Sequence, residues 1–405
     1  MTPTNSANRT ERACEVMIVG GGPTGLFLAT LLADLGVDVL VLERRAAPSA
    51  HSRAIGLHPP AVAALHEVGV ADAAVAAGAR IRGGSARSRG RELGRLSFER
   101  AWPRRPFVLS LPQSRTEELL EERLIELAPA ALRRGWEVTE LRATLHGVEV
   151  TAQPDLGADP DAGPLMVRAR VVVGADGARS RVRDLLGVGT TGAQYPDTYL
   201  MGDFAAPDAA GADRDAVIHL EPGGVVESFP LPGGGNRWVA HTGPAPPSAA
   251  SLDDLAEIVR TRTGVRLEAA SATMISAFTV RRRTARALVT GRCVLIGDAA
   301  HEISPIGGQG ITLGWLDALD LAPLLQQAAE NRQHGSLRSH PAWQRFERAC
   351  RSRARIARLL AHANMALGRP LPVPLAVARD VAVRVALGTP ARRVMAWAYS
   401  MGWAR

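Results

Sequence analysis

Three glycines near the N-terminal end of the sequence have the spacing of a phosphate-binding turn. They follow the pattern G-x-G-x-x-G and are Gly20, Gly22 and Gly25. An apolar stretch typical of a buried strand, 14–19, precedes them, and residues 26–35 follow with the apolar spacing of a helix. At such a turn, bare backbone N–H groups and the helix dipole can bind a pyrophosphate.

A carboxylate that could bind a ribose stands at the end of the next predicted strand. Residues 37–42 form that strand, and Glu43 follows it directly. There a carboxylate can accept hydrogen bonds from both ribose hydroxyls, so the combination favours a dinucleotide site over a purely structural turn. Strand, turn, helix and strand form a βαβ unit with parallel strands and a right-handed crossover.

A second glycine-rich group lies far along the chain, after a short apolar strand at 293–296. Asp298 follows that strand, where its carboxylate can bind a hydroxyl of a sugar alcohol. The residues before a helix expected at 311–327 include Pro305, Gly307, Gly308, Gln309 and Gly310. Glycines allow a flat ring to lie against the backbone, and a helix N-terminus stabilises negative charge on that ring. Two nucleotide-type turns in one chain favour a bound cofactor.

The elements around these motifs predict an α/β chain, α+β overall, with a Rossmann-like domain, an inserted mixed or antiparallel sheet domain and a C-terminal helical segment. A helix is expected at 115–127, and a hairpin of 147–152 and 165–173 ends near Asp176. The expected cofactor-binding domain is discontinuous and comprises 1–80, 107–186 and 291–338. The substrate-binding sheet comprises 81–106 and 187–290, and the helical segment 339–405.

Charge and composition exclude several classes of protein. The formal charge is +8, and all 48 basic residues are Arg, so chemistry that needs a lysine is excluded. The arginines are spread along the chain and aromatic residues are only 4%, so we expect no nucleic acid partner. An anionic cofactor accounts for the basic excess.

The three cysteines are far apart and predict neither a disulfide framework nor a metal site. We expect a cytoplasmic protein, since the sequence has neither a signal peptide nor an apolar run of membrane-spanning length. The basic amphipathic stretch after Pro341 could touch an anionic membrane, but a solvated helix face is the commoner structure. A monomer and a homodimer are both open.

The sequence resembles the single-component FAD-dependent aromatic hydroxylases typified by p-hydroxybenzoate hydroxylase. The motifs that carry the resemblance span about three quarters of the chain: GGGPTG (20–25), ERR (43–45), HSRAIGL (51–57), GADGARSRVR (174–183) and GDAAHEISPIGGQGITLGWLDA (297–318). The resemblance implies FAD as the cofactor and NADPH or NADH as co-substrate, with O2.

The resemblance also assigns roles to residues of this sequence. Gly20, Gly22 and Gly25 would hold the pyrophosphate of FAD, with Glu43 on the adenosine ribose and Arg44 near that half of the cofactor. Arg53 would lie beside the flavin, Gln113 would contact the cofactor, and Asp176 would serve FAD and NAD(P)H binding. Asp298 would bind the ribityl chain, and Pro305, Gly307, Gly308, Gln309 and Gly310 would line the isoalloxazine.

The implied reaction is hydroxylation or epoxidation of an apolar aromatic or polyketide-like molecule through a flavin C4a-hydroperoxide, in secondary metabolism such as antibiotic biosynthesis. The catalytic power would reside in the flavin, with no metal and no assigned catalytic side chain. Two other classes remain: a reductase or dehydrogenase of the same fold that acts on an isoprenoid or quinone, and a non-catalytic flavoprotein, which the intact motifs disfavour.

The pocket is expected between the inserted sheet and the flavin, lined by residues such as Val225, Phe229 and Trp238, although strand parity could reverse their faces. Candidates for a base that ionises a phenol are His51, His58, His219, His241, Tyr195 and Tyr199, and the sequence does not select one. Two departures from the family pattern, Thr312 in place of Asn and Glu302 after His301, concern the reactive edge of the flavin.

Overall fold

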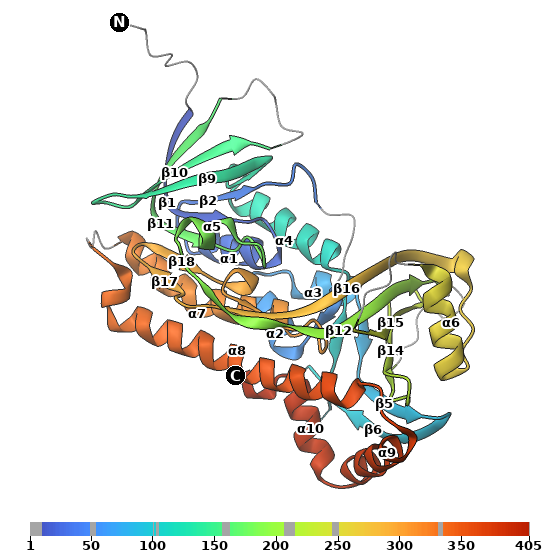
Figure 1. Ribbon diagram of the computed structural model, residues 1–405. Coiled ribbons are helices and arrows are strands. Elements are labelled where there is room, and N and C mark those ends of the chain that lie inside the picture. Colours follow the sequence, from blue (N-terminus) through green and yellow to red (C-terminus); the bar gives the residue numbers. More distant parts are fainter. Residues whose placement is uncertain are drawn as a thin grey trace, which may run out of the picture.

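The computed structural model describes residues 10–48, 54–99, 101–102, 105–155, 163–205, 215–244, 251–330 and 335–404. Two large sheets stand side by side, and helices cover and connect them (Figure 1).

The first sheet contains the predicted parallel βαβ unit. Its strands, in spatial order, are β17 (Val289–Thr290), β18 (Cys293–Leu295), β11 (Leu165–Gly174), β1 (Thr10–Val19), β2 (Val39–Glu43) and β8 (Leu132–Arg134), and β10 (Val148–Pro154) and β9 (Trp136–Ala143) extend it from β11. The pairs β1–β2, β1–β11, β11–β18 and β2–β8 are parallel, as a βαβ topology requires. The 14–19 strand, the 37–42 strand and the β10–β11 hairpin are thus confirmed.

Three helices pack together against this sheet, since their apolar residues and those of β1 belong to one buried cluster. They are α1 (Pro23–Asp34), α4 (Gln113–Leu127) and α7 (Gly310–Glu330). Phe27 of α1 stacks on Trp315 of α7, with ring centroids 4.9 Å apart. The predicted helices at 26–35, 115–127 and 311–327 are therefore confirmed, with ends shifted by a few residues.

The second sheet is mixed, as expected for the inserted region. Its strands, in spatial order, are β19 (His301–Glu302), β16 (Ala272–Ala285), β12 (Thr190–Phe204), β15 (Asn236–Gly243), β14 (Val226–Pro230), β13 (Ala216–His219), β5 (Gly83–Ser88) and β6 (Arg91–Ser97). All its pairs are antiparallel except β13–β5. The long strands β12 and β16 of the second sheet extend back toward the first sheet (Figure 1). They therefore connect the cofactor motifs to the inserted sheet.

Smaller elements complete the chain. A third sheet consists of β3 (Gly56–Leu57), β7 (Val108–Ser110) and β4 (Ala79–Ile81). The shorter helices are α2 (Pro59–Glu67), α3 (Ala71–Ala77), α5 (Arg181–Leu185) and α6 (Leu252–Thr263), with 3-10 turns η2 (Ala269–Ser271), η3 (Gly297–Ala299), η4 (Leu337–Ser339) and η5 (Gly402–Ala404). Gly69, with a φ of +76°, separates α2 from α3.

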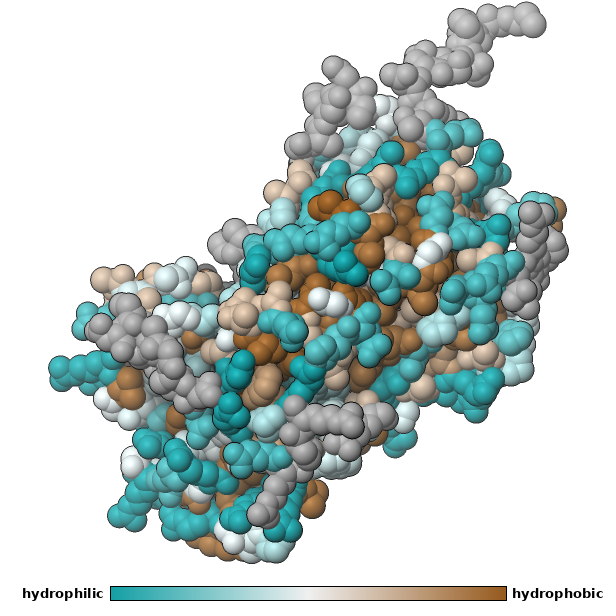
Figure 2. Space-filling view, turned by 180° about the vertical axis from the view of Figure 1, so that it is seen from behind, coloured by the Kyte–Doolittle hydropathy of each residue, from teal (hydrophilic) through white to brown (hydrophobic). Residues whose placement is uncertain are grey.

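The C-terminal segment is helical, as expected, and consists of α8 (Pro341–Gly368), α9 (Val373–Gly388) and α10 (Ala391–Tyr399). Helix α8 packs on α7 and extends toward the second sheet, where α9 and α10 lie beside β6 (Figure 1). In the described part of the chain, none of the helices is long and apolar enough to cross a membrane. From the opposite side, hydrophobic residues gather along the middle of the molecule, bordered by polar ones (Figure 2).

Candidate functional site

The first glycine turn combines close backbone packing with one open position. A Cβ on Gly25 would lie 1.9 Å from the Gly20 carbonyl oxygen, and a Cβ on Gly20 would lie 2.5 Å from the Ala175 oxygen. Gly20 also has a φ of +107°, which favours glycine. Gly22, the N-cap of α1, has no side-chain cap and no atom within 4 Å of the space that its Cβ would fill. The start of α1 can therefore accept an anion at close range.

Glu43 is buried behind this turn and bonds to it directly. Its Oε2 accepts a hydrogen bond from the Gly21 N–H at 2.7 Å, and its Oε1 accepts from the Arg45 backbone N–H and Nε, both at 2.9 Å. Burial alone would raise the pKa of Glu43, but the hydrogen bonds and charge of Arg45, with the Gly21 N–H, hold it below its usual value. The carboxylate is ionised at neutral pH and has lone pairs left for a ligand.

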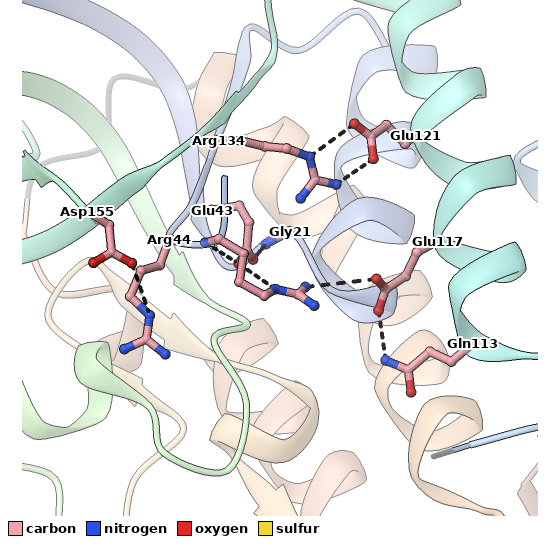
Figure 3. Close-up of polar contacts among 9 residues, drawn as sticks. Gly21, Glu43, Arg44, Gln113, Glu117, Glu121, Arg134 and Asp155 are labelled. Atoms are coloured by element: carbon pink, nitrogen blue, oxygen red, sulfur yellow. Dashed lines mark hydrogen bonds and ion pairs between the residues drawn. The ribbon is translucent and has the colours of Figure 1, made fainter. Parts of the chain in front are cut away.

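The two arginines after Glu43 have different partners, and Figure 3 shows Arg44 beside Asp155. Arg44 is 64% exposed and pairs with Glu137 at 3.6 Å and Asp155 at 3.9 Å, away from the glycine turn. Arg45 instead bonds Glu43 and lies 3.9 Å from Glu117 of α4. The sequence reasoning assigned the adenosine half to Arg44 and did not consider Arg45, although both belong to the ERR motif.

Gln113 opens α4 on the same side as Glu43. Its Nε2 donates to Glu117 Oε1 at 2.7 Å, which joins it to the network of Arg45 (Figure 3). Burial raises the pKa of Glu117, while the amide of Gln113 and the charge of Arg45 oppose that rise. Gln113 and Glu43 are therefore brought to one neighbourhood from segments that are well separated in the chain.

Asp176 supports the turn from the end of β11. Its carboxylate accepts from Ser180 Oγ at 2.5 Å and from the Val182 N–H at 3.0 Å, at the start of α5. Burial raises its pKa, against these hydrogen bonds. Its Cα is 2.8 Å from the Cβ that Gly20 would carry, so a side chain at Gly20 would collide with this segment.

The second glycine loop lies next to the first turn. The indole Nε1 of Trp315 in α7 donates to the Pro23 carbonyl at 2.9 Å. A Cβ on Gly297 would be 3.0 Å from Thr24 Oγ1, and one on Gly314 would be 2.4 Å from the same atom. The start of α1 and the second glycine loop, which are far apart in the chain, are therefore packed directly against each other.

The carboxyl group of Asp298 is available to a ligand. Burial of its surroundings raises its pKa to about 6, yet its side chain is accessible to solvent and has no hydrogen-bond partner in the described part of the chain. Glu302 adds to this rise, and His301 opposes it.

The loop from Pro305 to Gly310 leaves polar atoms without protein partners. Gly307 and Gly308 have φ values of +100° and +65°. Gln309 Oε1 and Thr312 Oγ1 are buried and lack a hydrogen-bond partner among the described residues. Buried polar groups are normally satisfied, so these atoms indicate a ligand at the start of α7.

Two buried histidines hold this loop from behind. His58 Nε2 bonds the Gly307 carbonyl oxygen at 2.7 Å, and burial lowers the pKa of His58 to about 4, so the ring is neutral and donates. His301 bonds Asp317, which also accepts from Arg353 of α8 at 3.1 Å. Burial alone would lower the pKa of His301, but the charge of Asp317 raises it. Asp317 lies within the quoted motif 297–318, but the sequence does not show that it meets His301 and Arg353, because Arg353 belongs to a helix that follows much later in the chain.

Arg53, assigned to the flavin, and His51, a candidate base, lie outside the described residues. Among the other candidate bases, burial lowers the pKa of His219 to about 4, and His241 bonds Asp197 at 3.2 Å.

The inserted sheet presents an apolar face to the second loop. Val225 and Phe229 belong to the same hydrophobic cluster as Ile306 of the loop. Trp238, expected in the pocket, was wrongly placed: it packs with Val226 and Leu255 of α6, on the opposite face. Trp238 pairs with Ser228, one position out of phase with Phe229, and neighbouring positions on a strand point to opposite faces.

Comparison with known proteins agrees with this architecture. A family described as "FAD binding domain" matches residues 13–343. The chain belongs to this FAD-binding family. FAD is therefore its cofactor, and the resemblance to FAD-dependent hydroxylases is confirmed.

Relatives and solved structures extend the comparison. The chain is 34% identical over 315 residues to 6-methylpretetramide 4-monooxygenase of Streptomyces rimosus, covering 76% of this chain and 55% of the relative. It is 35% identical over 318 residues to rifampicin monooxygenase of Streptomyces venezuelae, covering 76% and 63%. The structure of OxyS anhydrotetracycline hydroxylase from Streptomyces rimosus superposes with a TM-score of 0.76 at 30% identity, covering 96% of this chain and 76% of that one. The chain thus spans less than two thirds of the length of these two curated relatives.

The described residues fit FAD on their own geometry. The open start of α1 at Gly22 suits a pyrophosphate, and the glycine loop with the unpartnered Gln309 Oε1 suits a flat polar ring. Asp298 stands between these two regions with an unused carboxyl group.

Proposed function

We propose that the protein is a monooxygenase that uses FAD, NAD(P)H and O2 to hydroxylate or epoxidise an apolar aromatic or polyketide-like molecule in secondary metabolism. The observation that carries this proposal is the position of the second glycine loop, whose Ile306 belongs to the same apolar cluster as Val225 and Phe229 of the inserted sheet. A substrate on this face would lie beside the flavin ring.

The proposed cofactor contacts follow the two loops. Gly20, Gly22 and Gly25 would hold the pyrophosphate, and Glu43 would bind the adenosine ribose. Asp298 would bind the ribityl chain, while Pro305, Gly307, Gly308, Gln309 and Gly310 would line the ring. When bound, FAD would accept a hydride from NAD(P)H and deliver one oxygen atom of O2 to the substrate.

The chain's own contribution is positioning and exclusion of water. Tyr199 stacks on Phe278 with ring centroids 5.3 Å apart, and Met201 and Val239 adjoin them on the same face. Such an apolar wall keeps water from the reacting atoms, and it favours a ring system over a small charged substrate.

The names of the relatives support the substrate class. Enzymes at 34 to 35% identity are named for a pretetramide and for rifampicin, which are large ring systems. Among solved structures, p-nitrophenol 4-monooxygenase from Pseudomonas putida, at 23% identity and a TM-score of 0.83, shares the fold alone. We therefore favour a polycyclic phenol or quinone as substrate.

The test is product formation with labelled oxygen. The purified protein is expected to be yellow, to oxidise NADH or NADPH faster with a substrate from a panel of phenols and polycyclic quinones, and to incorporate one ¹⁸O atom from ¹⁸O2. Substrate reduction without label would instead establish a reductase. A protein that neither binds FAD nor turns over would contradict the proposal.

Asp298→Ala is the matched variant for this experiment, with Asp253→Ala on the exposed start of α6 as its control. Because Asp298 has no protein partner to lose among the described residues, its replacement is expected to lower the flavin content after purification while the fold is kept. An unchanged flavin content in Asp298→Ala would remove Asp298 from the FAD site.

A further inference from the structure

Glu227 is a carboxyl group on the apolar face of the inserted sheet. It lies on β14 between Val225 and Phe229, which both belong to the hydrophobic cluster that includes Ile306. Its cross-strand neighbours, Val239 of β15 and Ile218 of β13, belong to that cluster too. Strand alternation therefore directs Glu227 toward the cluster and the flavin loop.

The carboxyl group of Glu227 has no hydrogen-bond or ion-pair partner in the described part of the chain. Two arginines of this region are already paired: Arg237 bonds Asp203 at 2.6 and 2.7 Å, and Arg369 bonds Asp197 at 2.7 and 3.0 Å. Glu227 is half-buried, so its carboxyl group is open to a ligand whose donor takes the place of water in these apolar surroundings.

Glu227 lies near a tyrosine that contacts the residues behind the second glycine loop. The charge of Glu227 acts on the hydroxyl groups of Tyr199 and Tyr399. Tyr399 of α10 meets His58 edge to face, with centroids 5.8 Å apart, and His58 bonds the Gly307 carbonyl oxygen. Glu227 therefore faces the part of the pocket next to the proposed flavin ring.

We propose that Glu227 accepts the hydroxyl proton of a phenolic or enolic substrate, an inference that rests on the proposed function. In this step the O–H bond of the substrate breaks, its electron pair stays on the substrate oxygen, and the proton bonds to the Glu227 carboxylate. No oxidation occurs in the step. The resulting phenolate is more electron-rich, which favours attack by its ring carbon on an electrophilic oxygen atom.

The titration of the surrounding groups fits this role. Burial raises the pKa of Glu227 to about 7, where a base is most effective near neutral pH. Burial and the charge of Glu227 raise the pKa of Tyr199 and of Tyr399, so both hydroxyls stay protonated. Among the described charged groups of this face, the Arg237–Asp203 and Arg369–Asp197 pairs with His241 are bonded to one another, and Arg282 lies over the ring of Tyr195, 5.5 Å from its centroid.

The experiment is a binding titration of the oxidised, FAD-loaded protein with alizarin, a polycyclic phenol whose visible spectrum changes on ionisation. Anthraquinone, which has no hydroxyl group, is the control ligand. Glu227→Gln keeps the size of the side chain but removes the base, and Glu268→Gln on an exposed turn of the same region is the control variant.

Alizarin itself ionises near neutral pH, so we expect wild type and Glu268→Gln to bind it most tightly near pH 7, where one proton is shared between its hydroxyl group and the Glu227 carboxylate, and less tightly at higher pH, where both groups are ionised. Glu227→Gln is expected to lose this pH dependence. Its affinity for alizarin should fall roughly tenfold or more, which is the scale of a hydrogen bond to a charged group. Anthraquinone should bind wild type and Glu227→Gln with the same affinity. Equal alizarin affinities and pH profiles in wild type and Glu227→Gln would overturn the proposal, as would wild-type protein that does not bind alizarin.

The binding titration requires no turnover, so its outcome is separate from that of the proposed function. A protein that binds alizarin through Glu227 but incorporates no ¹⁸O in any substrate would keep the ligand assignment and reject the monooxygenase. If the protein incorporates ¹⁸O but the Glu227→Gln variant binds alizarin with the wild-type pH profile, the monooxygenase is supported and the role of Glu227 is rejected.

Discussion

The nucleotide end and the substrate face of this protein are built by different means. At the nucleotide end, the turn at Gly20, Gly22 and Gly25 and the carboxylate of Glu43 lie in one short stretch of chain, and the backbone makes most of the contacts. At the substrate face, Tyr199, Glu227 and Tyr399 come from three separate elements, the last of them near the end of the chain. A backbone site follows from local spacing, whereas a side-chain site follows from strand register and long-range packing.

The difference also appears in how each region satisfies its polar groups. Glu43 is buried and bonded to Gly21 and Arg45, so its position is determined before a ligand arrives. Glu227 has no partner among the described residues, and its surroundings are apolar. In the proposed function, the nucleotide end is therefore preorganised for the cofactor, and the substrate face leaves the carboxyl group of Glu227 free to bind a substrate.

The largest effect is expected from a substitution that disrupts the first glycine turn. In Gly25→Ala the new Cβ would lie 1.9 Å from the Gly20 carbonyl oxygen, and Gly20 cannot retreat because it packs on Ala175. We expect a loss of about 3 kcal/mol in the free energy of unfolding, measured by urea titration, and a colourless protein. Gly22→Ala, with open space at its Cβ, is the control and should keep wild-type stability while binding FAD less tightly. Equal stability of Gly25→Ala and wild type would contradict the packing argument.

A second prediction concerns the pH dependence of the free energy of unfolding, through His58, which bonds the second glycine loop at Gly307. His58 has a pKa of about 4 when folded and about 6.5 when unfolded, so the unfolded state binds more protons between these values. The stability that neutral His58 contributes is therefore present above about pH 6.5 and is lost as pH falls toward 4, by about 3 kcal/mol. His58→Asn should show a shallower loss in urea midpoints measured across this pH range. Parallel pH profiles for the two proteins would exclude this role.

A smaller effect is expected from the carboxylate of the nucleotide end. Glu43→Ala removes an ionised acceptor and is expected to weaken FAD binding by about 1–3 kcal/mol. Titration of the apoprotein with FAD measures this directly. Glu121→Ala on α4, whose partner is Arg134, gives a control outside the turn. An unaltered FAD affinity in Glu43→Ala would remove it from the site.

The smallest predicted effect is a difference in FAD affinity between variants of two adjacent arginines, Arg44 and Arg45. Arg45→Ala breaks the bond to Glu43 and is expected to weaken FAD binding by about 0.5–1 kcal/mol, the range of a partly exposed ion pair. Arg44→Ala loses only exposed contacts to Glu137 and Asp155 and should change FAD affinity by less than about 0.5 kcal/mol. The same FAD titration checks both variants, and a larger loss in Arg44→Ala than in Arg45→Ala would support the expected place of Arg44 near the adenosine half.

Much of the nucleotide end could be predicted from the sequence alone. The glycine turn, the parallel strands β1 and β2, and the helices α1 and α7 follow from spacing and periodicity, because backbone geometry limits which residues fit a strand-to-helix turn. The FAD-binding family followed from the same motifs.

The orientation of side chains was decided only by the tertiary structure. Arg44 and Arg45 lie in the bend after β2 and meet different partners. Successive residues of a strand point to opposite faces of the sheet, so Trp238 packs under α6 rather than toward the loop. The sequence contains both arginines and the tryptophan, but the side toward which each side chain points depends on how the surrounding elements pair and pack.

The same reason explains why the polar groups deep in the molecule escaped sequence reasoning. His301 and Arg353 both bond to Asp317, because elements far apart in the chain converge there. Glu227 has no hydrogen-bond partner among the described residues, because no donor from another element reaches it. Local spacing determined the cofactor and the family of this protein. Long-range packing, which no local pattern encodes, decided which side chains face the substrate.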